Sequence, residues 1–245
     1  MEYKLLSAFE RIFLGPIPHL DNPPPPYLHR NSVLGDYVAM HFYEDLYDLG
    51  DSSSYVSRVA NQQRLLNTGN MRRGIKARRG DGTFGQPVPH TPAIDDPGFV
   101  VARGQLATVE VGAEVKILAK AMVKQIGRVM SDLQDQVRHF HRGGGKPLTL
   151  GIVGVNHAEV ATSYEGDRSY TTTGTASFRH PIQEAHEVIA RLNAEARPHF
   201  DEFLILKYVS TNSEPWNFSW VNRAETAKDY GAVLVRISRA YQQRF

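Results

Sequence analysis

Apolar and polar residues alternate along the chain from Val109 to Leu118. Because successive side chains of a β-strand point to opposite faces, this alternation predicts a strand with one apolar face and one polar face. The apolar face would carry Val109, Val111, Ala113, Val115 and Ile117. The other face would carry Glu110, Gly112, Glu114 and Lys116. Two carboxylates and an amine therefore share one side of a strand that is otherwise suited to burial.

A helical periodicity follows this strand directly. Apolar residues spaced by three and four predict a long helix from about Ala119 to Arg142, which the glycines at 143–145 would end. Shorter helical patterns cover residues 3–14, 37–47, 55–67 and 182–196. Further apolar runs predict strands at 99–102, 148–155, 203–209 and 232–237, whereas 170–178 fits either a strand or a long loop.

The intervening segments contain residues that interrupt regular structure. Four consecutive prolines place an extended connector at 18–26, and the glycine-, proline- and arginine-rich region 68–97 is typical of a loop. A turn is expected at Arg103-Gly104-Gln105, and the aromatic–polar alternation of 216–220 favours a strand face. The order of helices and strands predicts one α/β domain around a mixed sheet, spanning residues 1–245.

The composition is that of an ordinary globular protein, with 41% hydrophobic and 22% charged residues and a formal net charge of +2. The absence of cysteine excludes disulfides, thiolate metal sites and a cysteine nucleophile. We find no signal-peptide pattern at the N-terminus and no apolar run of the length that a membrane helix needs, so we expect a cytoplasmic protein without a membrane partner.

The strand-and-helix context makes Glu114-Val115-Lys116 a candidate centre for metal-dependent phosphodiester hydrolysis. Carboxylate oxygens hold Mg²⁺, which offsets the charge of the transition state and lowers the pKa of water. A lysine beside them can position the nucleophile or stabilise developing charge. The alternative interpretation is a cross-strand ion pair on a half-exposed sheet.

This tripeptide and the order of elements around it resemble the PD-(D/E)XK nuclease superfamily. The resemblance implies a restriction-endonuclease-like fold, a mixed central sheet flanked by helices, whose core is a helix, a three-stranded meander, a second helix and a further strand. It covers residues 37–155, and 156–245 would be an elaboration. In this superfamily, an acid at the start of the second core strand and the acid of the tripeptide bind a divalent metal, and the lysine assists the attacking water.

The resemblance assigns Glu114 as the motif acid and Lys116 as the motif lysine. Asp96, which precedes the predicted strand at 99–102, would be the first acid, although it is followed rather than preceded by proline. Asp95 and Glu110 are alternatives for this position. Glu110 lies four strand residues, or about 13 Å, from Glu114 and would need a water molecule or a second metal to take part.

Basic residues near these positions suggest contacts with DNA. Five cations in eight residues suit phosphate contacts: Arg72, Arg73, Lys76, Arg78 and Arg79. The long helix carries a basic stripe of Lys120, Lys124 and Arg128. Some nuclease branches place a glutamine or lysine on this helix near the metal, which makes Lys124 and Gln125 secondary candidates.

The sequence therefore predicts a Mg²⁺-dependent endonuclease that cleaves double-stranded DNA, most simply a type II-like restriction enzyme acting as a homodimer in defence against foreign DNA. A repair or recombination nuclease is the first alternative. A non-catalytic nucleic-acid-binding protein on the same fold is the second.

Overall fold

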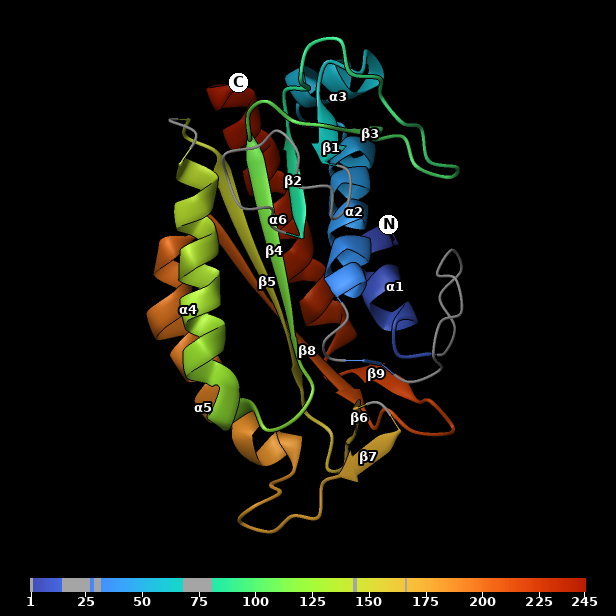
Figure 1. Cartoon of the computed structure of the whole chain (residues 1–245), viewed down its shortest axis with the longest axis vertical. Helices are drawn as coiled ribbons and strands as arrows, with labels where there is room; N and C mark the ends of the chain where they lie inside the picture. The colour runs from blue at the N-terminus through green and yellow to red at the C-terminus, as the bar shows by residue number, and fades with distance from the viewer. Residues whose placement is uncertain (1, 15–26, 29–31, 68–80, 143–144, 166) are drawn as a thin grey trace.

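The protein is an α/β structure in which, among the residues that the structure describes, one mixed sheet of seven strands is flanked by six α-helices (Figure 1). It is described here by a computed structural model, which covers residues 2–14, 27–28, 32–67, 81–142, 145–165 and 167–245. The strand order is β3-β1-β2-β4-β5-β8-β9. These strands span Leu65–Asn67 (β1), Gly82–Gly85 (β2), Arg103–Gly104 (β3), Val111–Leu118 (β4), Leu148–Asn156 (β5), Glu202–Ser210 (β8) and Phe218–Trp220 (β9).

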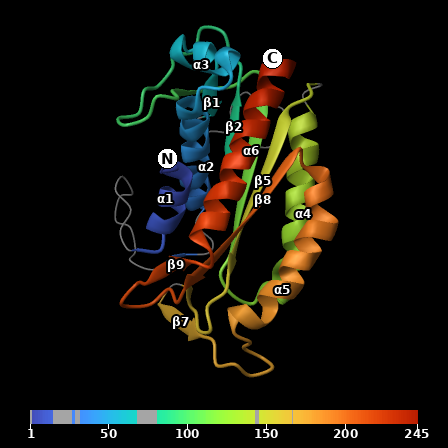
Figure 2. The same ribbon diagram turned by 180° about the vertical axis from the view of Figure 1, so that it is seen from behind.

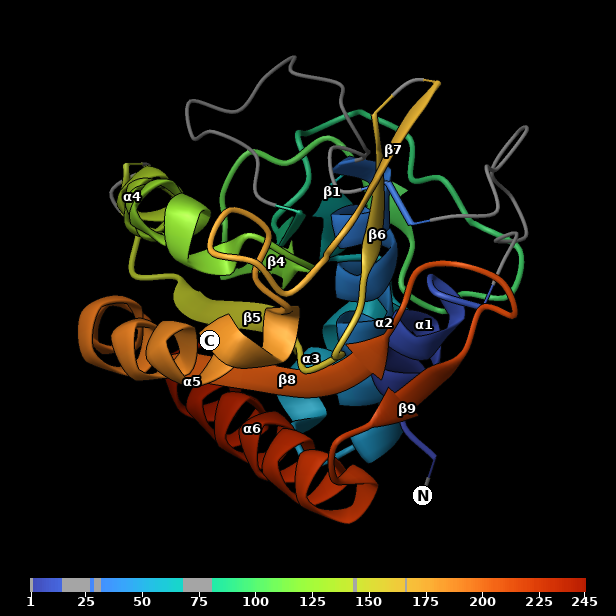
Figure 3. The ribbon, with the colours of Figure 1, turned by 90° about the horizontal axis from the view of Figure 1, so that it is seen from below.

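The sheet combines two kinds of strand pairing. β2 runs antiparallel to both of its neighbours, β1 and β4, while β1 and β3 are parallel. β4, β5 and β8 are mutually parallel, and β9 closes the other edge in the antiparallel sense. A separate two-stranded hairpin, β6 (Thr162–Glu165) with β7 (Arg168–Thr171), extends from the end of the molecule where β4, β5 and β8 finish (Figure 3).

Helices cover both faces of the sheet, as Figures 1 and 2 show from opposite sides. One face carries α4 (Met122–His141) and α5 (Pro181–Arg191), and these two pack in one apolar cluster with β5. The opposite face carries α1 (Lys4–Arg11), α2 (Ser32–Leu49) and α6 (Arg223–Arg244), which form the larger cluster. α3 (Ser53–Ala60) lies beside the end of α6.

Helix α4 begins without a capping side chain of its own, because its N-cap residue is Ala121, whose methyl group cannot accept a hydrogen bond and whose backbone is left-handed with φ of 50°. The carboxylate of Glu184 on α5 takes that role and accepts the backbone N–H groups of Met122 at 2.5 Å and Val123 at 3.3 Å. Such contacts satisfy donors that the first helical turn leaves unpaired. The start of α4 is therefore fixed by its neighbouring helix.

Most of the long elements expected from the sequence are confirmed. The alternating strand corresponds to β4, the long helix to α4, and the strands at 148–155 and 203–209 to β5 and β8. The helices expected at 3–14, 37–47 and 182–196 correspond to α1, α2 and α5, the last continuing into a short π-helical turn at Leu192–Ala196. β7 overlaps only the first two residues of the segment 170–178, which fitted either a strand or a loop. β9 lies within the expected strand face at 216–220.

Several shorter expectations are wrong. Residues 232–237 lie inside α6 rather than in a strand, because Val233, Leu234 and Ile237 form the buried side of that helix. The helix expected at 55–67 ends at Ala60 and is followed by β1, and β2 lies inside the expected loop 68–97. The connector at 18–26 falls outside the described residues.

The segment 99–102 also fails to form a strand, and Arg103-Gly104 forms the two-residue edge strand β3 rather than a turn. A buried carboxylate explains this difference. Glu44 of α2 accepts the backbone N–H groups of Val100 at 2.9 Å and Val101 at 2.7 Å. These donors are therefore held by a helix side chain instead of by a neighbouring strand.

Among the residues that the structure describes, none of the helices combines the length and the apolarity needed to span a membrane.

Candidate functional site at the start of β2

Strand β4 presents different chemistry to the two sides of the sheet. Val111, Ala113 and Val115 belong to the apolar cluster with α2 and α6. Gly112 faces α4, since a Cβ at this position would lie 2.7 Å from ring atoms of Phe140. Alternation then places Glu114 and Lys116 on the α4 side as well. The sequence prediction of one apolar and one polar face is confirmed for the residues within β4.

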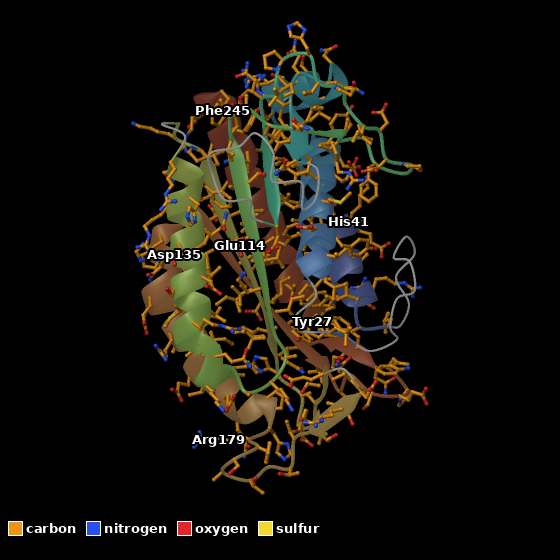
Figure 4. The ribbon with its side chains drawn as sticks, in the orientation of Figure 1. Tyr27, His41, Glu114, Asp135, Arg179 and Phe245 are labelled. Atoms are coloured by element: carbon orange, nitrogen blue, oxygen red, sulfur yellow. The ribbon has the colours of Figure 1, made fainter. Side chains whose placement is uncertain are left out.

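Glu114 and Lys116 are in direct contact on this face. The ammonium of Lys116 donates a hydrogen bond to Oε1 of Glu114 and forms an ion pair with it. Glu114 is buried, with 6% of its surface exposed, whereas 27% of the Lys116 side chain is exposed. One member of the pair is therefore buried and the other is partly exposed to solvent. Figure 4 shows Glu114 on the sheet between α4 and α2.

A second carboxylate, Asp81, reaches the same place from the neighbouring strand. Gly82 is paired with Ala113 in the antiparallel register of β2 and β4, so Asp81 lies beside Glu114. Oδ2 of Asp81 accepts the backbone N–H of Val115 at 2.8 Å. The Asp81 side chain also lies against α2, the helix on the face of the sheet opposite α4, and Gly35 of α2 leaves space for it, since a Cβ there would lie 2.6 Å from Cγ of Asp81.

The two carboxylates affect one another electrostatically. Burial raises the pKa of the Glu114 carboxyl to about 7, and the negative charge of Asp81 adds to the rise, whereas Lys116 opposes it. Burial by itself lowers the pKa of Lys116, but the charges of Glu114 and Asp81 outweigh it and raise the pKa above its usual value. The site therefore favours a proton or a cation beside its carboxylates.

Helix α4 adds two polar residues above this face. Phe140 near the end of α4 lies over Gly112 near the start of β4. Because α4 runs antiparallel to β4, each step of four residues back along the helix matches a step of two residues forward along the strand. The steps are about 6 Å on the helix and about 6.6 Å on the strand. Gln136, which is buried with 4% of its surface exposed, is thus level with Glu114. Asp132 is level with Lys116, and its charge also raises the pKa of Lys116.

Asp96 does not lie beside Glu114, so the expectation that these two acids share one site is wrong. Its carboxylate forms an ion pair with Arg103 of β3, at the edge of the sheet. β1 and β2 separate β3 from β4, so the strands lie about 14 Å apart. The alternative acid Asp95 is also displaced, since its Oδ1 accepts a hydrogen bond from Gln62 at 2.9 Å.

Glu110 is not on the Glu114 face either, so the expectation that they share a face is wrong. β4 begins one residue later, at Val111, and the Glu110 carboxylate turns toward α6. There it accepts a hydrogen bond from the Tyr241 hydroxyl at 2.5 Å and pairs with Arg64 and with Arg58, the latter at 3.6 Å. Its surroundings make it a structural ion pair on the opposite side of the sheet.

The secondary candidates on α4 lie near its first turn. The Gln125 amide donates to the carbonyl of Lys120 at 3.4 Å, and Lys124 is exposed. Eleven residues of helix, or about 16 Å, separate Gln125 from the level of Glu114. By this spacing Gln136, rather than Gln125 or Lys124, lies at the level of Glu114 along the helix. The expected DNA-contact residues Arg72, Arg73, Lys76, Arg78 and Arg79 lie outside the described residues.

Sequence reasoning missed Asp81 because its strand is short and contains two glycines, Gly82 and Gly85. The available signal was an acid directly before Gly82-Thr83-Phe84-Gly85, two residues after the basic segment 72–79. Pairing with both β1 and β4 is what makes this segment a strand, and local sequence does not contain that information.

The donor set fits Mg²⁺ rather than a metal that requires a full protein cage. No group of three or more His, Asp or Glu residues suited to a metal ion occurs within the described part of the chain. Mg²⁺ is usually held by one or two carboxylates together with water and substrate phosphates. Asp81 and Glu114 provide two such carboxylates beside a partly exposed lysine.

Comparisons with protein-family models, with curated proteins and with solved structures find no match.

Proposed function

We propose that this chain is a Mg²⁺-dependent deoxyribonuclease of the PD-(D/E)XK type, with Asp81 and Glu114 as metal ligands and Lys116 as the residue that assists the attacking water. The observation that carries the proposal is the position of Asp81. It stands immediately before β2, beside Glu114, and accepts a hydrogen bond from the residue between Glu114 and Lys116. An acid at the start of the second core strand is what the resemblance requires.

The order of elements around these residues supports the same proposal. After α2 and the short helix α3 come the three strands β1, β2 and β4, which pair in that order as a meander, and then α4 and β5. This matches the core of a restriction-endonuclease-like fold as a helix, a meander, a second helix and a further strand. The short edge strand β3 is an insertion between the second and third strands of the meander.

Each site residue has a defined part in phosphodiester hydrolysis. When bound, Mg²⁺ would offset charge on the phosphate and lower the pKa of water. Asp81 and Glu114 would hold it with oxygens from two adjacent strands. Because the pKa of Lys116 is raised, its amine stays protonated at neutral pH. In that form Lys116 would orient the water or stabilise negative charge by donating hydrogen bonds.

For the biological role, we propose double-stranded DNA as substrate and a type II-like restriction enzyme as the first interpretation. A homodimer would allow both strands to be cut. A repair or recombination nuclease is the alternative within the class, and the pattern of products separates the two: a restriction enzyme gives discrete fragments from a mixed-sequence plasmid, whereas a nuclease without a fixed site gives nicks or a smear.

The decisive experiment compares matched variants in a plasmid-cleavage assay with Mg²⁺ and with EDTA. Asp81→Asn and Lys116→Ala should each lower the cleavage rate by about 10²-fold or more, because Asp81 would hold the metal and Lys116 would assist the attacking water. Asp96→Asn and Lys124→Ala should retain cleavage close to that of the wild type. Circular dichroism of each variant verifies that it is folded.

A loss of cleavage in Asp96→Asn but not in Asp81→Asn would overturn the assignment of Asp81. If the wild type binds DNA in a gel-shift assay but does not cleave it with any divalent cation, the non-catalytic binding protein replaces the nuclease.

A further inference from the structure

Lys116 lies between carboxylates from two different elements. Glu114, two residues earlier on β4, holds its ammonium directly. Asp132 on α4 is half-buried and level with Lys116, because the contact of Phe140 with Gly112 fixes how the helix lies over the strand. The negative charge of Asp132 adds the smallest of the contributions that raise the pKa of Lys116, after those of Glu114 and Asp81. The lysine therefore has a second acidic neighbour on the side opposite the sheet.

The contact between Lys116 and Glu114 conflicts with metal binding at Glu114. A divalent cation held by the Glu114 carboxylate would lie close to the ammonium that the same carboxylate accepts, and the two positive charges would repel each other. The lysine side chain has a flexible four-carbon stem, which allows its charge to move by several ångströms. Asp132 is a nearby carboxylate that can receive it.

We propose that Asp132 is a positioning residue that takes the ammonium of Lys116 from Glu114 when a divalent cation occupies Asp81 and Glu114. The inference rests on the proposed function, since it assumes that these two acids bind the cation. Asp132 thereby keeps Lys116 charged and beside the site while freeing the Glu114 oxygen. Asp132 touches neither the cation nor the substrate and acts through the lysine alone.

Carbodiimide cross-linking of the full-length protein tests this movement directly, because it forms an amide only between a carboxylate and an amine in contact. Without Mg²⁺, the link should join Lys116 to Glu114. With saturating Mg²⁺, we expect a link between Lys116 and Asp132, found by mass spectrometry as a joined pair of tryptic peptides, 104–120 and 129–138. Fragment ions distinguish Asp132 from Asp135 within the second peptide.

Matched variants give a second measurement on the same protein. Asp132→Asn should weaken Mg²⁺ binding, measured by titration calorimetry, by about 10-fold, as loss of an outer-shell partner commonly does. Asp135→Asn, which lies on the same helix and pairs with Arg138, should leave Mg²⁺ affinity unchanged. Figure 4 shows the position of Asp135 on α4. Asp132→Glu should restore most of the affinity, which a purely structural role in α4 would not predict.

The outcomes separate the inference from the function on which it rests. If Mg²⁺ binds the wild type but not Glu114→Gln, and the Lys116–Asp132 link does not increase with Mg²⁺, the positioning role is overturned while the metal site stands. If Mg²⁺ does not bind the wild type at all, both are overturned. An increase in the link together with the weaker binding of Asp132→Asn supports the role.

Discussion

At the scale of single residues, the site is defined by an imbalance of charge. Asp81 and Glu114 bring two carboxylates together at the start of β2, and Lys116 contributes one ammonium. Even with that ammonium in contact, the pKa of Glu114 stays raised to about 7, so a further positive charge is needed to stabilise its ionised form. A half-exposed surface ion pair, the alternative interpretation of Glu-x-Lys, would not combine a buried carboxylate with a second acid.

The raised pKa of Glu114 predicts how stability depends on pH in the absence of metal. The carboxyl retains its proton up to about pH 7 in the native state but only to its ordinary value of 4.5 when unfolded. Between these values the native state binds more protons, so the free energy of unfolding falls as pH rises. The fall is at most about 3 kcal/mol, since one pKa unit corresponds to about 1.4 kcal/mol. Urea unfolding at pH 5, 6, 7 and 8 measures it.

The Glu114→Gln variant provides the control for this measurement. Glutamine has the same shape and cannot ionise, so the difference between the variant and the wild type should grow as pH rises toward 8. Added Mg²⁺ should reverse the loss in the wild type alone, because a ligand that binds only the native state stabilises it. A stability difference that is independent of pH would contradict the prediction.

At the scale of elements, the packing of α4 on β4 sets the level of every polar group above the sheet. Gly112 is the point of closest approach, where the strand has no side chain and the ring of Phe140 fills the space. From this contact, Gln136 and Asp132 follow at one-turn intervals toward the start of α4. The separation of helix and strand therefore controls the distance from α4 to Glu114 and Lys116.

A methyl group at Gly112 tests this dependence. Gly112→Ala should destabilise the protein by about 1–3 kcal/mol, because a Cβ 2.7 Å from Phe140 overpacks a filled space. Combining it with Phe140→Leu, which replaces the ring by a smaller side chain, should recover part of that loss. Chemical unfolding of both single variants and the double variant gives the coupling energy. Additive effects of the two substitutions would show that they do not share one space.

The sequence predicts an element when its own pattern of buried residues defines it, and fails to predict one that depends on pairing with distant strands. β4 and α4 were predictable because their periodicity reflects burial on fixed faces, including Glu114 and Lys116 as neighbours on one face. β2 was not, since a four-residue strand with two glycines exists only through pairing with β1 and β4. The sequence gives no sign that Asp81 lies beside Glu114 for the same reason, since strand pairing brings the two together.

For Asp96, the error is a strand that is expected after it but does not form. It was chosen because an apolar segment follows it, but the backbone of that segment is held by Glu44 of α2. Asp96 then pairs with Arg103, an interaction that local sequence gave no reason to prefer. α6 was misread in part because 232–237 is apolar at five of six positions, although the spacing of Tyr230, Val233, Ile237 and Tyr241 is helical over a longer window.

At the scale of the whole molecule, the proposed nuclease core depends on both ends of the chain. The larger apolar cluster joins residues of α2, β4 and β5 to Leu5 and Phe9 of α1 and to Tyr230 and Leu234 of α6. The N-terminal helix is also tied to α2, since Asp45 accepts the backbone N–H groups of Lys4 at 2.7 Å and Leu5 at 2.9 Å. Segments outside residues 37–155 are thus part of the same interior.

This dependence predicts that the core will not fold alone. A fragment of residues 32–156 loses the buried partners contributed by α1, β8 and α6. Each large apolar side chain contributes about 1.5–3 kcal/mol when buried, and a whole domain is stable by only about 5–15 kcal/mol, so losing several exceeds the margin. The fragment should show no cooperative urea transition by far-ultraviolet circular dichroism.

The full chain should instead unfold in one transition. Its two tryptophans, Trp216 and Trp220, lie at or beside β9, far along the chain from β4 and α4. Tryptophan fluorescence therefore reports on the C-terminal part, whereas circular dichroism reports on all helices. Coincident urea midpoints from the two signals indicate one cooperative unit, because two independent units would unfold separately. Separate midpoints, or a folded fragment, would instead make 156–245 an addition to an independent core, and would remove α6 from the elements that hold β4 in place.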